Sequence, residues 1–198
     1  PLDLRATALA FLHRRPATPP QKVTEPLTEA GTIRVMTYNV HSCVGMDGRL
    51  SVDRVARVIA QYQPDIVALQ EVDVGRERTL GHDQAQQIAE QLNMEHHFHP
   101  AMKVEEELYG DAVLSCLPMR LVKADTLPRR SPSAKLEPRG ALWVEVQKQG
   151  RSLQLINTHF GLNRRERLLQ AEALVSEAWL GNSACQGPTV LCGDLNAL

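Results

Sequence analysis

Polar side chains stand at the ends of several predicted strands, where an apolar core would not select them. They are Asn39, Glu71, His159 and the closely spaced pair Asp194 and Asn196. Each of these residues alone is typical of a cap or a turn. The ends of neighbouring strands can meet at one edge of a sheet, where active sites commonly lie. Polar residues at several successive strand ends therefore favour one shared site.

Carboxylate and amide oxygens suit a hard cation such as Mg²⁺ or Mn²⁺. Glu71 directly follows an apolar strand and is the strongest ligand candidate, because a cation stabilises a partly buried carboxylate. Asp194 can hold a water molecule or accept its proton, and Asn39 and Asn196 can orient a phosphate oxygen or Asp194 without adding charge. His159 can stabilise charge that develops on a transferring phosphoryl group. The set predicts metal-assisted hydrolysis of a phosphate ester.

Other catalytic classes find little support in the sequence. Ser115 and Cys116 lie in a predicted strand without the Gly-x-Ser-x-Gly turn of a serine hydrolase. The four cysteines have no Cys-x-x-Cys spacing, which predicts reduced, mostly buried thiols in a cytoplasmic protein rather than a zinc site. A formal net charge of −1 provides no global field that attracts nucleic acid.

The elements that position these side chains alternate between β and α from residue 32 onward. Ser51 is a good N-cap for a helix that ends before Pro64, and further helices are expected over 83–93 and from Asn163 to about Leu180. Strands are expected at 33–40, 65–71, 97–102, 112–116, 120–127, 140–147, 152–159 and 188–192. The pattern predicts a layered α/β fold.

The first part of the chain differs from the rest. Residues 1–31 contain several prolines and no strand-like run, which predicts an extended linker or tail. The domain is therefore expected over residues 32–198. Both ends look like cuts in a longer polypeptide.

Short motifs occur in the order found in the endonuclease/exonuclease/phosphatase superfamily, which the chain resembles from about residue 32 to 198. The motifs are Thr37-Tyr-Asn39, Pro64-Asp-Ile-Val-Ala-Leu-Gln-Glu71, Tyr109-Gly-Asp-Ala-Val-Leu-Ser115, Asn157-Thr-His159 and Gly193-Asp-Leu-Asn196. Its members include deoxyribonucleases, abasic-site endonucleases, sphingomyelinases and inositol-polyphosphate 5-phosphatases. Within the superfamily, Gly45-Met-Asp-Gly48, Gln70-Glu-Val-Asp73, Arg76 and Glu137-Pro-Arg-Gly140 resemble a bacterial branch with relatives beside or fused to phospholipid-handling proteins.

The resemblance implies a four-layer α/β sandwich of two mixed sheets flanked by helices. It also implies roles for the polar strand ends. Glu71 would be the principal Mg²⁺ ligand with Asn39 beside it, and His159 would contact the scissile phosphate. Asp194 would orient or deprotonate the attacking water, supported by Asn196.

The chain departs from the family pattern in two places. Asp111 replaces an asparagine after Tyr-Gly, and a carboxylate there repels phosphate unless a cation intervenes. It therefore either recruits substrate or a second metal, or points away as a structural residue. The C-terminal Ser-Asp-His segment of the family is also missing. We accordingly expect a sandwich that is incomplete at its C-terminus and impaired in activity, and a full protein that continues beyond Leu198.

Several other polar groups have weaker claims. His96, His97 and His99 lie in one predicted strand and are expected to be partly exposed rather than to bind metal. His41 follows the first strand and is placed to enter the site, but no role is assigned to it. In the last predicted helix, Leu168, Ala171, Val175 and Ala178 share one face and are expected to pack in the core.

Three functions follow, of which the first is favoured. It is Mg²⁺-dependent (or Mn²⁺-dependent) hydrolysis of a lipid headgroup or another small phosphorylated substrate, with peripheral contact to membrane lipid. The near-neutral charge and the aromatic content of 4% favour it over a nuclease of the same superfamily acting on nucleic acid. The third is a non-catalytic binding or scaffold domain, suggested by Asp111 and the missing C-terminal segment.

Overall fold

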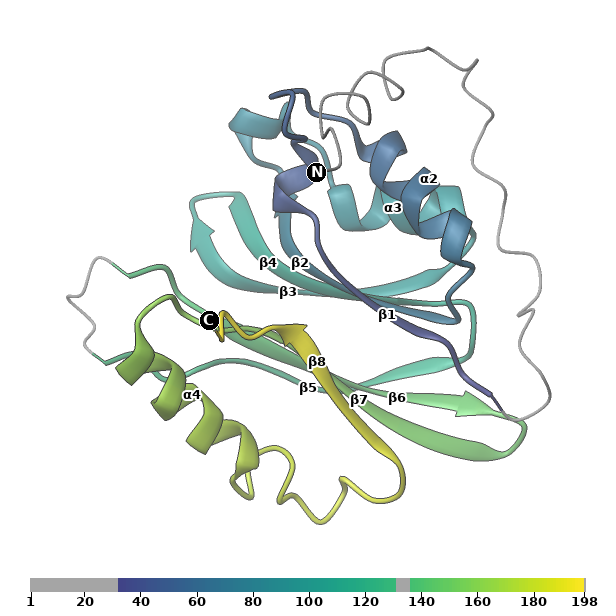
Figure 1. Cartoon of the computed structure of the whole chain (residues 1–198), viewed down its shortest axis with the longest axis vertical. Coiled ribbons are helices and arrows are strands. Elements are labelled where there is room, and N and C mark those ends of the chain that lie inside the picture. Colours follow the sequence, from purple (N-terminus) through teal and green to yellow (C-terminus); the bar gives the residue numbers. More distant parts are fainter. Residues whose placement is uncertain (1–31, 131–135, 198) are drawn as a thin grey trace, which may run out of the picture.

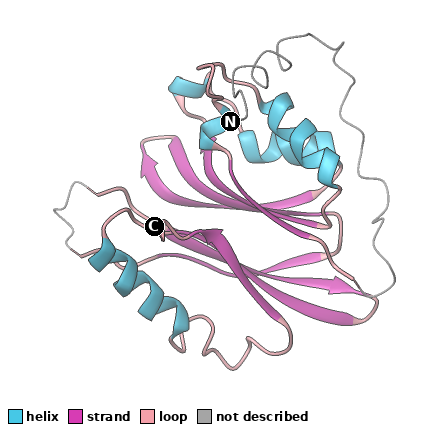
Figure 2. Cartoon of the chain, in the orientation of Figure 1, coloured by secondary structure: helices cyan, strands magenta, loops and turns pink. Residues whose placement is uncertain are grey.

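Two four-stranded sheets pack face to face, and helices cover the outer face of each, as the computed structural model shows (Figure 1). The structure describes residues 32–130 and 136–197. The predicted linker over residues 1–31 lies outside them. Figure 2 separates the resulting layers, helices, sheet, sheet and helix, which confirms the predicted four-layer α/β sandwich of two mixed sheets.

The first sheet has the strand order β1-β2-β4-β3. Its strands are β1 (Val35–Asn39), β2 (Ile66–Val74), β3 (Glu95–Val104) and β4 (Glu107–Ser115). β1 runs parallel to β2, whereas β4 is antiparallel to both β2 and β3. Helices α2 (Val52–Tyr62) and α3 (Gln84–Leu92) lie against its outer face, next to the short helices η2 (His41–Cys43) and η3 (Glu77–Thr79).

The second sheet has the order β5-β6-β7-β8 and carries helix α4 on its outer face. Its strands are β5 (Met119–Thr126), β6 (Gly140–Lys148), β7 (Arg151–His159) and β8 (Thr189–Asp194), and α4 spans Arg164–Val175. β5, β6 and β7 form antiparallel pairs, and β8 is parallel to β7. The parallel pairs β1–β2 and β7–β8 bring the carboxyl ends of four strands to one edge of the sandwich.

Side-chain caps define where the longer helices begin. Ser51 accepts a hydrogen bond from the backbone N–H of Arg54, Asp83 from that of Gln86, and Asn163 from Arg165 and Glu166. These bonds satisfy N–H groups that have no partner within the first turn. The predictions that helices follow Ser51 and Asn163 are confirmed.

Apolar residues from both sheets fill the space between them. The cluster consists of Ile66, Val113, Leu142, Val144, Val146, Leu153 and Leu155. A second cluster joins the first sheet to α2 and α3, and a third joins the second sheet to α4 and the segment that follows it. The strands at the centre of the sandwich are therefore anchored on both faces.

Two expectations about the last helix are wrong. α4 ends at Val175 rather than near Leu180, because the Ser176 hydroxyl bonds to the carbonyl of Ala173 and the chain turns away. Of the four residues expected in the core, Leu168, Val175 and Ala178 are exposed, and Ala171 alone packs against the third cluster. The buried residues of α4 are Glu166, Gln170 and Leu174. Polar side chains occupy the inward face, so apolar periodicity selected the wrong face.

Other details agree with the sequence. The histidines at 96, 97 and 99 are partly buried in β3, as expected. All four cysteines are free, although only Cys43 is buried. Among the described residues, none of the helices combines the length and the apolar character required to cross a bilayer.

Candidate active site

Glu71 owes its position to a bulge in β2. The register between β2 and β4 shifts between Leu69 and Val72, and Glu71 adopts a φ of 59°. An extra residue in one strand lets two neighbouring side chains leave the regular alternation. Gln70 is consequently buried between the sheets, whereas Glu71 reaches the edge of the sandwich. Glu71 lies inside β2, which continues to Val74, and not at the end of the strand as predicted.

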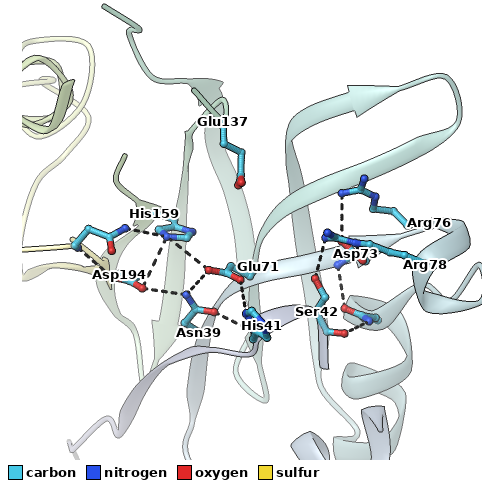
Figure 3. Close-up of polar contacts among 12 residues, drawn as sticks. Asn39, His41, Ser42, Glu71, Asp73, Arg76, Arg78, Glu137, His159 and Asp194 are labelled. Atoms are coloured by element: carbon cyan, nitrogen blue, oxygen red, sulfur yellow. Dashed lines mark hydrogen bonds and ion pairs between the residues drawn. The ribbon is translucent and has the colours of Figure 1, made fainter. Parts of the chain in front are cut away.

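Asn39 joins Glu71 to Asp194 (Figure 3). Its Nδ2 donates a hydrogen bond of 2.8 Å to Oε1 of Glu71 and one of 3.0 Å to Oδ2 of Asp194. Its Oδ1 accepts from the backbone N–H of His41 at 3.0 Å, which fixes the amide with its NH₂ group toward the carboxylates. Side chains from β1, β2 and β8 are thereby brought together, although β1 and β2 belong to the first sheet and β8 to the second.

Asp194 depends on a close approach of two backbones. A Cβ atom on the preceding Gly193, which has a φ of 136°, would lie 1.8 Å from the carbonyl oxygen of Thr158. Burial opposes ionisation of Asp194, but hydrogen bonds from Asn39 and from the backbone N–H of Asn196 hold its pKa below the usual value. Asp194 is therefore ionised near neutral pH.

His159 faces both carboxylates from the end of β7. Its Nε2 lies 3.9 Å from Oε1 of Glu71 and 3.8 Å from Oδ2 of Asp194. On its other side Nδ1 lies 3.3 Å from a guanidinium nitrogen of Arg139, which can only donate. Nδ1 must then be the acceptor, so the proton of the neutral ring is on Nε2. Burial, reinforced by the charge of Arg139, lowers the pKa of His159 and keeps it neutral.

Asn196 packs against the same histidine. Its Nδ2 donates to the carbonyl of Phe160 at 2.8 Å and lies 3.2 Å from Nε2 of His159. With the histidine proton on Nε2, the second of these is a contact between donors, and the bond to Phe160 is the one that fixes Asn196.

Asp111 is buried in β4, with 2% of its surface exposed and no hydrogen bond to its side chain from the described residues. Burial raises its pKa to about 8, and the charges of Glu71, Glu137 and Asp194 act in the same direction against Arg139. Asp111 is thus near enough to Glu71, Asp194 and Arg139 for their charges to act on its pKa, but it is not among the residues that line the cleft.

His41 was placed near the site by its sequence position but given no role. Its Nδ1 lies 3.2 Å from Oε2 of Glu71. His41, Ser42 and Cys43 have φ values of 48°, 50° and 58°, a left-handed conformation that is costly for residues other than glycine. The carbonyl of Ser42 accepts from Nε2 of Gln84 at 2.7 Å, which helps to hold this unusual turn at the site edge.

Several site residues were not identified as such from the sequence. Glu137 and Arg139 form an ion pair of 2.6 Å at the site, and Arg76 and Arg78 line its other end. All four lie in or beside segments that resemble the bacterial branch, which was the available signal. Gln70 and Asn157 were also missed, because a buried amide that links two sheets has no pattern in one strand.

These groups line a cleft of about 960 Å³ at the edge of the sandwich. It contains Glu71, His159, Asp194 and Asn196, together with His41, Tyr109, Glu137 and three arginines. The cleft is acidic where Glu71, Asp194 and Glu137 gather, and basic around Arg76 and Arg78.

The acidic part has the donor chemistry of a site for a hard cation. Among residues 32–130 and 136–197, no three side chains of the His, Cys, Asp and Glu types are arranged to hold a metal by themselves. Mg²⁺, however, is commonly bound by one or two carboxylates together with water and substrate phosphate. Glu71 and Asp194 supply two such carboxylates, both bonded to the amide of Asn39.

The sequence and the fold are both similar to known proteins. The model of the Endonuclease/Exonuclease/phosphatase family matches residues 36–198. An endonuclease/exonuclease/phosphatase from Beutenbergia cavernae DSM 12333 is 25% identical, with a TM-score of 0.65, over 83% of this chain and 47% of that one. No curated protein is similar at a significant level.

Two other solved structures share the fold. A conserved protein of unknown function from Enterococcus faecalis V583 is 21% identical, with a TM-score of 0.62, over 83% of this chain and 67% of that one. The human Nocturnin catalytic domain with bound sulfate is 24% identical, with a TM-score of 0.58, over 83% of this chain and 65% of that one. The chain thus spans between about half and two thirds of these proteins. From its family match and its fold, the chain belongs to the endonuclease/exonuclease/phosphatase family.

Proposed function

We propose that the chain carries the catalytic site of a hydrolase that uses Mg²⁺ or Mn²⁺ to cleave phosphate esters. The observation that carries this proposal is the convergence of Glu71 and Asp194 on one amide, that of Asn39, with His159 facing both carboxylates. The substrate we favour is a lipid headgroup or another small phosphorylated molecule in the cytoplasm.

Glu71 is the proposed principal ligand of the cation. Asn39 is proposed beside it, but its NH₂ group faces the carboxylates, so ligation through Oδ1 requires the amide to rotate and release His41 N–H. Asn39 in its present orientation holds Glu71 and Asp194 at a fixed separation. When bound, the cation supplies electrostatic stabilisation of charge on the phosphate.

His159 acts on the substrate as a neutral donor. Arg139 leaves the ring proton on Nε2, which faces the space between the two carboxylates. A phosphate oxygen placed there can accept this proton in a hydrogen bond, which is strongest as negative charge builds up on the oxygen. Because the pKa of His159 is lowered, this donor persists at neutral pH.

Asp194 orients the attacking water. Its lowered pKa keeps it an acceptor, and bonds from Asn39 and Asn196 N–H hold its two oxygens in place. A water that donates one proton to Asp194 has its lone pair directed to the phosphorus atom. Asn196 stabilises the loop that follows β8 through its bond to Phe160.

Metal binding and turnover test this proposal separately. Glu71→Gln and Asp194→Asn should each weaken Mn²⁺ binding, measured by electron paramagnetic resonance, by at least tenfold. They should also abolish Mg²⁺-dependent hydrolysis of bis(p-nitrophenyl) phosphate. Glu172→Gln, which removes an exposed carboxylate on α4, is the matched control and should change neither.

Two outcomes would contradict the proposal. Wild-type rates or Mn²⁺ affinity in both site variants would show that the site is misassigned. A folded wild-type protein that binds Mn²⁺ but hydrolyses neither phosphodiesters nor phosphomonoesters would favour the non-catalytic binding domain.

A further inference from the structure

We propose that Arg76 and Arg78 form a second subsite in the cleft, which binds an anionic group of the substrate other than the phosphate that is cleaved. That a substrate is cleaved in this cleft rests on the proposed function, whereas the binding of an anion by Arg76 and Arg78 does not. The subsite adds a substrate class: phosphate esters that carry a further phosphate or carboxylate.

A buried carboxylate anchors both arginines. Asp73 has no exposed surface, and it accepts from Nε of Arg78 at 2.8 Å and from Nη2 of Arg78 at 2.7 Å. The Thr79 hydroxyl donates to it at 3.1 Å, and Nη1 of Arg76 lies 3.9 Å away. This two-pronged contact fixes the plane of the Arg78 guanidinium, as a binding group requires.

In the ion pair of Arg78 and Asp73, the guanidinium of Arg78 is on the cleft side and the carboxylate of Asp73 is buried behind it. The side chain of Arg78 is 51% exposed, whereas that of Asp73 is 0% exposed. A ligand entering the cleft therefore meets the guanidinium and not the carboxylate behind it. Among the described residues, nothing accepts a hydrogen bond from Nη1 of Arg78 or from Nη2 of Arg76. Both nitrogens keep donors for a ligand.

Neighbouring side chains hold Arg78 in this position. Its Nη2 also donates to Oγ of Ser42 at 3.0 Å, and its guanidinium carbon lies 5.5 Å from the centre of the Tyr109 ring. Gln84 supports the arrangement from below, because it donates to the carbonyl of Ser42 and accepts from the backbone N–H of Asp73. The strained turn at Ser42 therefore helps to hold Arg78 in place.

The subsite is separate from the acidic end of the cleft. In Figure 3, Asp194 and Arg76 lie on opposite sides of Glu71 and His41. An extended substrate with one phosphate at the acidic end can therefore direct another anionic group toward Arg76 and Arg78. A substrate with a single phosphate cannot use both ends.

Phosphate binding without metal is the first test. With EDTA present, the acidic end repels inorganic phosphate, so binding reports on the arginines. Titration followed by NMR should shift the Nε–H signals of Arg76 and Arg78. Arg78→Gln should weaken the affinity about tenfold or more and Arg78→Lys by less, since lysine keeps the charge but loses the fork. Arg151→Gln, at the exposed start of β7, is the control.

The phosphate titration in EDTA gives a clear answer even if the protein is not an enzyme. A phosphate affinity that changes less than twofold in both Arg78→Gln and Arg76→Gln would overturn the subsite, provided that melting temperatures show both variants folded. If Arg78→Gln unfolds, Arg76→Gln alone decides, because Glu107 is 33% exposed and Asp73 keeps its two hydrogen bonds from Arg78 when Arg76 is replaced.

Substrate pairs then identify the source of the anion. TpT and its 5′-phosphorylated form pTpT differ by one phosphate, as do vesicles that contain phosphatidylinositol or phosphatidylinositol 4-phosphate. With Mg²⁺, wild type should have a lower KM for the member of one pair that carries the extra phosphate, and Arg78→Gln should remove that difference in KM. An unchanged preference in Arg78→Gln would also refute the subsite. Absence of turnover would instead count against the proposed function and leave the EDTA result standing.

Discussion

The amide nitrogen of Gln70 donates a hydrogen bond of 2.8 Å to the amide oxygen of Asn157, and both side chains are buried between the two sheets. Nδ2 of Asn157 in turn donates to the carbonyls of Leu69 and Ala112 in the first sheet, at 2.8 Å and 3.0 Å. Gln70 immediately precedes Glu71, and Asn157 lies two positions before His159. This network therefore fixes the two halves of the candidate site relative to each other.

Asn157→Leu should reduce both stability and function. It removes bonds from Gln70 and from two buried carbonyls, and each unsatisfied buried group costs roughly 1–3 kcal/mol. Urea unfolding should show a loss of about 2–4 kcal/mol, and Mn²⁺ affinity should fall because Glu71 and His159 lose their fixed spacing.

Gln154→Leu provides the matched control, since this buried amide lies in the same strand and accepts a hydrogen bond of 2.8 Å from Nε1 of Trp143, away from the site. It should destabilise the protein without weakening Mn²⁺ binding. Equal effects of the two substitutions on Mn²⁺ affinity would mean that the Gln70–Asn157 bond has no specific part in positioning the site.

Arg139→Gln should raise the pKa of His159, measured by NMR of its ring. Arg139 is a cause of the lowered value, and Glu71 and Asp194 favour the charged ring once it is gone. Phosphoesterase activity should then fall at mildly acidic pH, as the change in protonation disturbs the donor geometry. A His159 pKa that stays the same or decreases would show that Arg139 does not keep the ring neutral, whereas Arg151→Gln should leave the pKa of His159 unchanged.

The sequence located most of the site because strand ends carry local signals. Asn39, Glu71, His159 and Asp194 each follow an apolar or β-branched run, and the structure brings them together. The roles assigned to them stay predictions. Arg76 and Arg78 could not be identified as site residues from the sequence. The orientation of Arg78 depends on its bond to the buried Asp73, five positions earlier, which no local pattern indicates.

The elements were predicted well where propensity and burial agree. Ser51 and Asn163 cap their helices, and the strand periodicity identified β1 and β7 closely. The face of α4 was not predictable, because its inward positions are held by the polar Glu166 and Gln170. The bulge at Glu71 likewise arises from pairing with β4, which the sequence of β2 alone does not specify.

Asp111→Asn should stabilise the metal-free protein increasingly as pH rises. The pKa of Asp111 is raised from 3.8 to about 8 by burial and by neighbouring carboxylates, so the folded state retains a proton that the unfolded state releases. The favourable contribution is complete below pH 4 and is lost as pH increases toward 8. In EDTA, the variant should gain on the order of 1–3 kcal/mol over wild type at pH 8 and little at pH 4.

Urea unfolding of both proteins across this range measures the difference. Asp125→Asn, an exposed position in β5, should give a curve parallel to that of wild type. A constant difference between Asp111→Asn and wild type from pH 4 to pH 8 would show that Asp111 is already ionised at low pH.

Salt dependence of nucleic-acid binding separates the favoured substrates from those of a nuclease. A protein that neutralises several phosphates of double-stranded DNA loses affinity steeply with salt, with a slope of about −0.9 per phosphate contact. The formal net charge of −1 and the carboxylates of the cleft predict weak binding, with a slope no steeper than about −2 in this relation. Fluorescence anisotropy of a labelled duplex between 50 and 200 mM salt, in EDTA to prevent cleavage, measures it. A slope of about −5 or steeper would reverse the preference and favour the nuclease.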